Sequence, residues 1–172
     1  MRRVDMDRSN IILIGMPGVG KSTLGVLLAK AVRRDFLDTD VCLQAQSGRR
    51  LQDIVDDEGP DGLRLLEERT ILGLQCTNTV IATGGSAIYS QEAISRLAAG
   101  GRILYLYLPL ELLRPRLTNL DERGVVRQKG QTFDSLFAER QALYERYAEI
   151  TIDCSGKNHE QVVQDMVRAL EL

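Results

Sequence analysis

The sequence lacks two features that mark common classes of protein. Its 22 lysines and arginines face 24 aspartates and glutamates, a net charge of −2, so there is no basic excess to hold a nucleic acid backbone. No apolar run approaches the roughly 20 residues that span a bilayer. We therefore expect a small molecule as the partner, with no nucleic acid and no membrane.

Cysteine and histidine are also scarce. The three cysteines, Cys42, Cys76 and Cys154, are widely spaced and form no CxxC pair, which favours unpaired thiols in a reducing compartment. The amino end, MRRVDMDRSN, is charged and lacks the apolar segment of a secretory signal. The single histidine, His159, opens an expected helix, where exposure to solvent is the simplest interpretation. The sequence thus predicts a cytoplasmic protein.

Apolar runs typical of buried parallel strands alternate with segments of helical periodicity, a pattern that indicates an α/β domain. With 172 residues, 44% of them hydrophobic, the chain is long enough for one domain and short for two, so we predict a single domain over residues 1–172. The expected strands are 11–14, 36–37, 79–82, 102–108 and 150–152. The expected helices are 21–34, 41–46, 51–57, 60–75, 91–98, 110–117, 132–148 and 158–170, with Pro60 in a first helical turn.

One long polar loop stands out, TNLDERGVVRQKGQ at residues 118–131. It is rich in charge and contains two glycines. Loops of this length in a compact domain are typically functional lids or disordered segments, and the sequence leaves both interpretations open.

The segment GMPGVGKS, residues 15–22, fits the phosphate-loop pattern G-x-x-x-x-G-K-[ST] between a strand and a helix. Backbone N–H groups of such a loop surround phosphate oxygens at a helix N-terminus, where the helix dipole favours negative charge. Lys21 can reach the β- and γ-phosphates, and the Ser22 hydroxyl can bind Mg²⁺. The alternative is a glycine-rich turn with an incidental lysine. We expect a nucleotide to contact Gly18, Val19, Gly20, Lys21, Ser22 and Thr23.

A phosphate loop predicts a nucleotide but leaves the reaction open. The NKxD sequence typical of GTPases is absent, and none of the later expected strands ends in an acid. Asp38 and Asp40, in LDTD, follow the second expected strand at the edge where parallel sheets bind ligands. One carboxylate could face a metal and the other a hydroxylated acceptor. Alternatively, Thr39 or Asp40 could cap the following helix.

The motifs together resemble the shikimate kinase family over nearly the whole chain: the phosphate loop, LDTD, GLRLLE, ATGGSA, an arginine-bearing loop and ERQALYERYA. The resemblance implies a P-loop fold of three α/β/α layers, similar to nucleoside monophosphate kinases, with a five-stranded parallel sheet in the order 2-3-1-4-5. It also implies a monomer that uses ATP and Mg²⁺ to phosphorylate a hydroxyl of shikimate, in aromatic amino acid biosynthesis.

On the nucleotide side, the resemblance assigns Ser22 to the metal, Asp38 to the metal through a water molecule, and Arg116 to the adenine face. Arg123, in the 118–131 loop, would approach the transferred phosphate. Together with Asp40, which would hold the reacting hydroxyl and accept its proton, Lys21 and Arg123 are the expected catalytic residues.

On the acceptor side, the resemblance assigns Arg64 and Arg140 to the carboxylate of the acid, with Glu67 orienting Arg64. The bidentate fork of a guanidinium suits such an anion. Gly84 and Gly85 would offer backbone N–H groups to the substrate.

Four residues depart from the usual family pattern, namely Pro60, Leu63, Ser86 and Gly124. They leave open which hydroxy acid is the acceptor. One alternative is a kinase of another sugar acid such as gluconate, or of a nucleotide, although Asp40 suits hydroxyls better than a phosphate. Another is a module that binds ATP and regulates a partner without catalysis. Such a module would not need all of the charged residues assigned above, which counts against this alternative.

Overall fold

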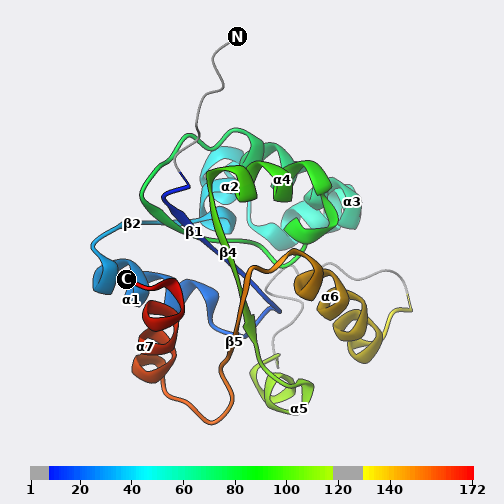
Figure 1. Cartoon of the computed structure of the whole chain (residues 1–172). Coiled ribbons are helices and arrows are strands. Elements are labelled where there is room, and N and C mark those ends of the chain that lie inside the picture. The colour runs from blue at the N-terminus through cyan, green and yellow to red at the C-terminus, as the bar shows by residue number, and fades with distance from the viewer. Residues whose placement is uncertain (1–7, 118–129) are drawn as a thin grey trace.

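The computed structural model describes residues 8–117 and 130–172. Its centre is a sheet of five parallel strands in the order β2-β3-β1-β4-β5 (Figure 1). The strands are β1 (Asn10–Ile14), β2 (Asp35–Asp38), β3 (Thr79–Ala82), β4 (Gly101–Tyr107) and β5 (Ile150–Asp153). The fold, strand order and parallel pairing that the sequence predicted are confirmed.

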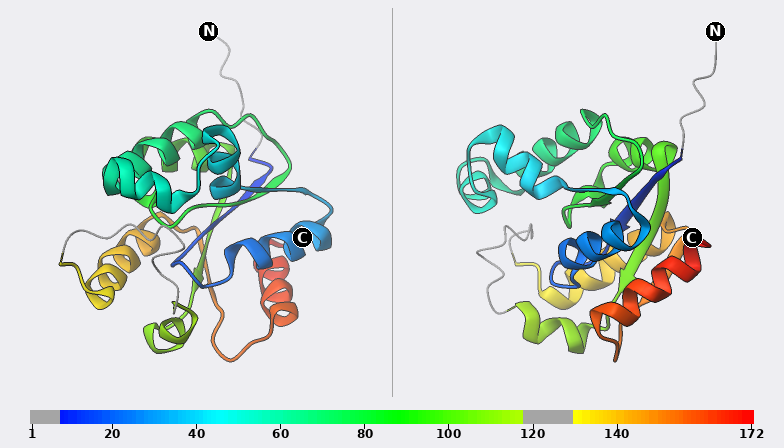
Figure 2. Two further views of the ribbon diagram at one scale, coloured as in Figure 1. Left: turned by 180° about the vertical axis from the view of Figure 1, so that it is seen from behind. Right: turned by 90° about the vertical axis from the view of Figure 1, so that its left-hand side faces the viewer.

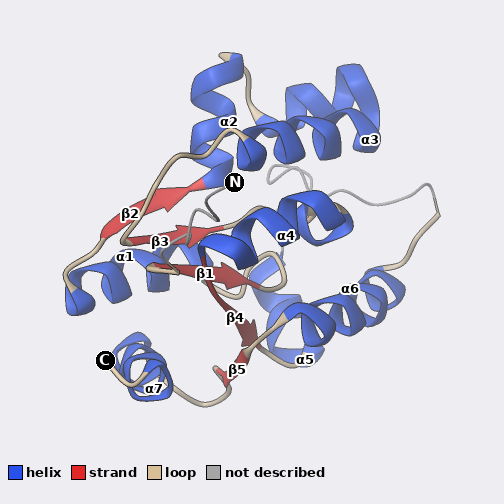
Figure 3. Cartoon of the chain, turned by 45° about the horizontal axis from the view of Figure 1, so that its top comes forward, coloured by secondary structure: helices blue, strands red, loops and turns tan. Residues whose placement is uncertain are grey.

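Helices lie on both sides of this sheet (Figures 2 and 3). Helices α1 and α7 pack against each other, and α4 packs on β1 and β4. The α-helices are α1 (Lys21–Val32), α2 (Thr39–Ser47), α3 (Leu51–Leu72), α4 (Gln91–Gly100), α5 (Leu110–Leu113), α6 (Phe133–Tyr147) and α7 (His159–Leu170). Two 3₁₀ turns complete the described elements, η1 (Ala87–Tyr89) and η2 (Arg114–Leu117). None of the helices described is both long and apolar enough to cross a membrane.

Two prolines mark the places where α5 ends early and where α3 divides into two segments. The prediction of one helix over 110–117 was wrong, because the α-helix ends at Leu113 and a 3₁₀ turn follows. Pro115 has no N–H to donate, so the α-helical hydrogen bonds cannot continue there. In α3, Gly59 has non-helical dihedrals (φ 73°, ψ 179°), so the helix consists of two segments, and Pro60 opens the second as expected.

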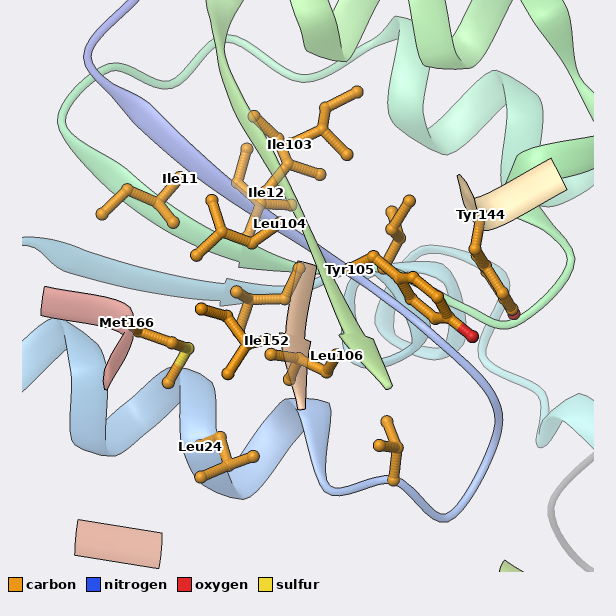
Figure 4. Close-up of a cluster of buried hydrophobic side chains, with 14 of the residues drawn as sticks. Ile11, Ile12, Leu24, Ile103, Leu104, Tyr105, Leu106, Tyr144, Ile152 and Met166 are labelled. Atoms are coloured by element: carbon orange, nitrogen blue, oxygen red, sulfur yellow. The ribbon is translucent and has the colours of Figure 1, made fainter. Parts of the chain in front are cut away.

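The main core fills the space between the sheet and its helices (Figure 4). All four apolar residues of β1 and most of β4 are buried, because central strands of a parallel sheet are covered on both faces. Tyr105 of β4 stacks on Tyr144 of α6, with ring centroids 5.0 Å apart. This contact fixes α6 against the sheet.

A second, smaller core lies between α2 and α3. Its buried residues are Leu43 from α2, with Ile54 and Leu63 from the two segments of α3. The first segment of α3 therefore packs mainly on α2 rather than on the sheet. This α2–α3 unit forms one wall of the cleft described below.

Candidate active site

A cleft of about 830 Å³ opens at the carboxyl ends of β1, β2 and β3, the edge where parallel α/β sheets bind ligands. It gathers residues from six separate segments of the chain. The predicted site residues that line it are Gly18, Gly20, Lys21, Ser22, Thr23, Asp38, Asp40, Gly85, Arg116 and Arg140. Val19 is buried below the loop, and Arg64 lines an adjoining cavity of about 250 Å³. Arg123 and most of the 118–131 loop lie outside the described residues.

The phosphate loop has a backbone that needs glycine. Gly18 (φ 82°) and Gly20 (φ 108°) lie in the left-handed region, which side chains disfavour. At Gly15 (φ 150°) an added Cβ would stand 2.6 Å from the carbonyl oxygen of Leu106 in β4. No side chain caps the start of α1, so its first N–H groups remain available to an anion.

Lys21, the first residue of α1, folds back over this loop. Its Nζ donates to the carbonyl oxygens of Gly15 (2.7 Å) and Met16 (3.1 Å). Burial lowers the pKa of Lys21 to about 8, although the charge of Asp40 partly opposes this shift. The amine is thus held over the phosphate loop.

Asp38 joins the phosphate loop to β2. Its Oδ2 accepts from the Ser22 hydroxyl at 2.6 Å. Its Oδ1 accepts from the backbone N–H groups of Asp40 (2.9 Å) and Val41 (3.3 Å), so Asp38 caps α2. The alternative in which Thr39 or Asp40 is the cap was therefore wrong. Because the chain turns into the helix directly after β2, the last strand residue already has the extended dihedrals of a cap.

Asp40 and Glu67 converge on one point beside Gly84. A Cβ added to Gly84 would stand 1.9 Å from Glu67 Oε1 and 2.6 Å from Asp40 Oδ1. Burial, and then the nearby charge of Asp38, raise the pKa of Asp40 to about 6. Burial, and then the charge of Asp40, raise the pKa of Glu67 to about 8. Two carboxyl groups thus lie in the cleft, where burial limits their contact with water. Carboxyl groups with shifted pKa values in a cleft are typical of functional sites.

The Gly84 backbone N–H has a partner within the protein. Its N–H donates to Thr39 Oγ1 at 2.9 Å, a buried bond that ties the turn after β3 to the start of α2. The expectation that Gly84 offers its N–H to the substrate stays a prediction, and in this structure that donor is bonded to Thr39. What Gly84 contributes is space for the two carboxylates. Thr39 was missed as a site residue, although its place in LDTD marked it.

The two arginines expected on the acceptor side come from different helices. Arg140 of α6 is only 1% exposed, and its Nη1 lies 2.7 Å from the position of an added Cβ on Gly85. Arg64 of α3 lies over the ring of Tyr89, 4.1 Å from its centroid. Arg64 Nε and Glu67 Oε2 are both buried and have no hydrogen-bond partner among the described residues. Arg64 thus stacks on Tyr89, a residue that nothing in its local sequence singled out, while the charge of Arg64 also acts on Glu67.

The comparison with known proteins agrees with this geometry. The shikimate kinase family model matches residues 17–171. The chain belongs to the shikimate kinase family. It is 36% identical over 167 residues to shikimate kinase 2 of Enterobacter sp. (strain 638), covering 94% of this chain and 95% of that protein. It is 34% identical over 169 residues to a shikimate kinase of Vibrio vulnificus (strain YJ016), covering 96% and 98%.

Solved structures of shikimate kinases have the same fold. Shikimate kinase from Acinetobacter baumannii in complex with shikimate gives a TM-score of 0.87 at 30% identity, covering 94% of this chain and 92% of that one. A gluconokinase from Sinorhizobium meliloti gives 0.52 at 20% identity, covering 99% and 94%, a likeness that extends to the fold alone. As a shikimate kinase family member, the protein is an ATP-using phosphotransferase that acts on a hydroxyl group.

Proposed function

We propose that this chain transfers the γ-phosphate of ATP to the 3-hydroxyl of shikimate, forming shikimate 3-phosphate. The observation that carries the proposal is the meeting of Lys21, Asp40 and the buried Arg140 in one cleft. This arrangement combines a phosphate loop with a carboxylate and a guanidinium, which suit a hydroxyl and a carboxylate on the same acceptor. Family membership supports shikimate as that acceptor.

On the nucleotide side, the first N–H groups of α1 and the Lys21 amine bind the phosphates, and Arg116 lies at the adenine end. The Ser22 hydroxyl and the Asp38 carboxylate, 2.6 Å apart, supply the oxygen ligands that Mg²⁺ prefers, so this pair fits the ion. When bound, Mg²⁺ offsets negative charge on the phosphates. Arg123 is the predicted contact to the transferred phosphate, and this assignment rests on sequence alone.

On the acceptor side, Arg140 and Arg64 bind the carboxylate of shikimate, and the Gly85 backbone lies beside Arg140. Asp40 holds the reacting hydroxyl and accepts its proton as the oxygen bonds to the γ-phosphorus. The bond between that phosphorus and the bridging oxygen breaks, and ADP leaves. Lys21 stabilises the charge that spreads over the phosphate oxygens.

We also propose that the protein is a single domain that acts as a monomer in the cytoplasm, without nucleic acid or membrane partners. The net charge of −2 supports the absence of a nucleic acid partner. Residues 118–131 are proposed, from sequence, to close over both substrates.

A substrate panel tests the proposed function. ADP formation is measured with shikimate, quinate, gluconate and a nucleoside monophosphate, and ³¹P NMR identifies the product. We expect the highest kcat/KM with shikimate and a phosphate monoester at its 3-position. A higher kcat/KM with gluconate or the nucleoside monophosphate would show that this compound, and not shikimate, is the acceptor. If the protein binds ATP but forms no ADP with any of the four acceptors tested, the result would instead support a regulatory module.

A further inference from the structure

Tyr89 connects the two arginines of the acceptor side. It ends η1, just after the glycine turn that follows β3, and its side chain is half-buried. The guanidinium carbon of Arg64 lies 4.1 Å from the ring centroid and that of Arg140 lies 5.5 Å from it. Arg140 Nε also donates to the Tyr89 hydroxyl at 3.4 Å. One aromatic ring thus contacts a cation from α3 and a cation from α6.

The position of the Tyr89 ring is itself fixed from α6. Its hydroxyl donates to Glu139 Oε1, and Gln131 Nε2 donates to Glu139 Oε2 at 3.0 Å. Glu139 and Arg140 are neighbours on α6, so the Tyr89 hydroxyl meets an acceptor and a donor from the same helical turn. This geometry sets both the place and the tilt of the ring that Arg64 covers.

Arg64 depends on this ring more than Arg140 does. Besides the ring, the described residues offer Arg64 an ion pair at 3.6 Å with Asp61, whose side chain is 96% exposed. Such exposed pairs add little to stability, and the Nε of Arg64 has no hydrogen-bond partner among the described residues. Two guanidinium groups that converge on one anion also repel each other. The negative face of an aromatic ring attracts both cations and reduces that cost.

We propose that Tyr89 is a positioning residue for the acceptor carboxylate, acting through Arg64 and Arg140. Tyr89 and Arg64 both line the small cavity. Tyr89 is not among the residues that line the main cleft. Ser86 lines both, so the two spaces adjoin. Tyr89 therefore contacts the arginines rather than the substrate, and it holds them as a pair before the acid binds. This inference rests on the proposed function.

Steady-state kinetics of Tyr89→Leu test the proposal. We expect the KM for shikimate to rise about three- to thirtyfold, the range of a partly desolvated cation–π contact. The kcat should stay within twofold, and the KM for ATP should not change, because the nucleotide side is untouched. Tyr89→Phe keeps the ring and should restore most of the affinity for shikimate. Tyr147→Leu is the matched control, since it removes a similar contact with Arg146 (5.6 Å) outside the cleft.

A double-mutant cycle separates positioning from a general structural effect. If Tyr89 acts through Arg64, Tyr89→Leu should add little to the KM of an Arg64→Ala enzyme. An equal rise in both backgrounds, an unchanged KM in Tyr89→Leu, or a matching rise in the KM for ATP would each overturn the proposal. Thermal melting verifies the fold, and Tyr89→Met replaces Tyr89→Leu if the latter does not fold. If the wild-type enzyme leaves shikimate unphosphorylated, it is the proposed function that fails.

Discussion

The Ser22 hydroxyl and the Asp38 carboxylate are hydrogen-bonded at 2.6 Å, although Ser22 lies in the first turn of α1 and Asp38 ends β2. This bond joins the phosphate-loop end of α1 to the end of β2 and brings two side-chain oxygens together. The other carboxylate of LDTD, Asp40, lies within the cleft beside Glu67. The two acids of the motif therefore have different contacts: Asp38 contacts the phosphate loop, and Asp40 lies beside Glu67.

Lys21→Ala should reduce kcat by about 10²-fold or more, because a charge held over the phosphates is lost. The free energy of unfolding should fall by about 1–3 kcal/mol at most, since Lys21 contributes two hydrogen bonds to loop carbonyls. Turnover and urea unfolding are measured side by side. The control is Lys30→Ala, an exposed lysine in the last turn of α1. A folded Lys21→Ala enzyme with wild-type kcat would contradict the assignment.

Asp40→Asn should lower turnover far more than it lowers ATP affinity. The amide has the size of the carboxylate but cannot accept the proton of the reacting hydroxyl, so we expect a loss of about 10²-fold or more in kcat. Nucleotide affinity is measured by calorimetry in the absence of shikimate. Asp35→Asn, at the exposed start of β2, the strand that precedes Asp40, is the control. Equal losses of affinity and turnover would place Asp40 at the metal instead.

Glu67→Gln should change how stability depends on pH. The folded-state pKa of Glu67, about 8, lies above its ordinary value of 4.5, so the folded state binds the proton more tightly. This contribution to stability is complete below about pH 4.5 and is lost as the pH rises towards 8. Glutamine cannot titrate, so the variant should gain more than about 1 kcal/mol over the wild type between pH 5.5 and pH 7.5.

Urea unfolding at several pH values measures this difference. Glu111→Gln, an exposed position on α5, serves as the control and should follow the wild type. Parallel curves for the wild type and Glu67→Gln would show that Glu67 is ionised in the folded protein throughout this range.

Gly84→Ala should damage the acceptor side. The new Cβ would stand 1.9 Å from Glu67 Oε1 and 2.6 Å from Asp40 Oδ1, so at least one carboxylate must move. We expect a destabilisation of about 1–3 kcal/mol and a higher KM for shikimate. Gly100→Ala is the control, because there the nearest contact is a side-chain nitrogen of Asn10 at 3.4 Å. A Gly84→Ala enzyme with wild-type stability and KM would show that the two carboxylates are not fixed there.

Local patterns account for the parts of the fold that the sequence predicted well. The 79–82 strand was predicted to the residue, because a buried parallel strand is apolar on both faces. The edge strand β2 was predicted as 36–37 but covers Asp35–Asp38, since its ends are defined by backbone pairing with β3 rather than by apolar side chains. The fully buried β1 was predicted one residue short, as 11–14, because its first residue, Asn10, is polar.

The site was predictable only where a motif fixes the backbone. The phosphate loop and LDTD led directly to the cleft, because their side chains project from positions that the strand ends determine. The choice of Asp38 as the cap depended on dihedral angles that LDTD does not encode. The contact of Arg64 with Tyr89 joins residues 25 positions apart and depends on side-chain rotamers, so no local pattern could predict it.

Leu63 lines the cleft and is also one of the three buried residues in the small core between α2 and α3. A replacement there that reshapes the cleft also disturbs the packing of the α2–α3 unit, so selectivity and stability change together. Val41 lines the same cleft but is 60% exposed and belongs to neither core cluster. Evolution or engineering towards another acid can therefore vary Val41 freely, whereas Leu63 constrains how far the cleft can be redesigned.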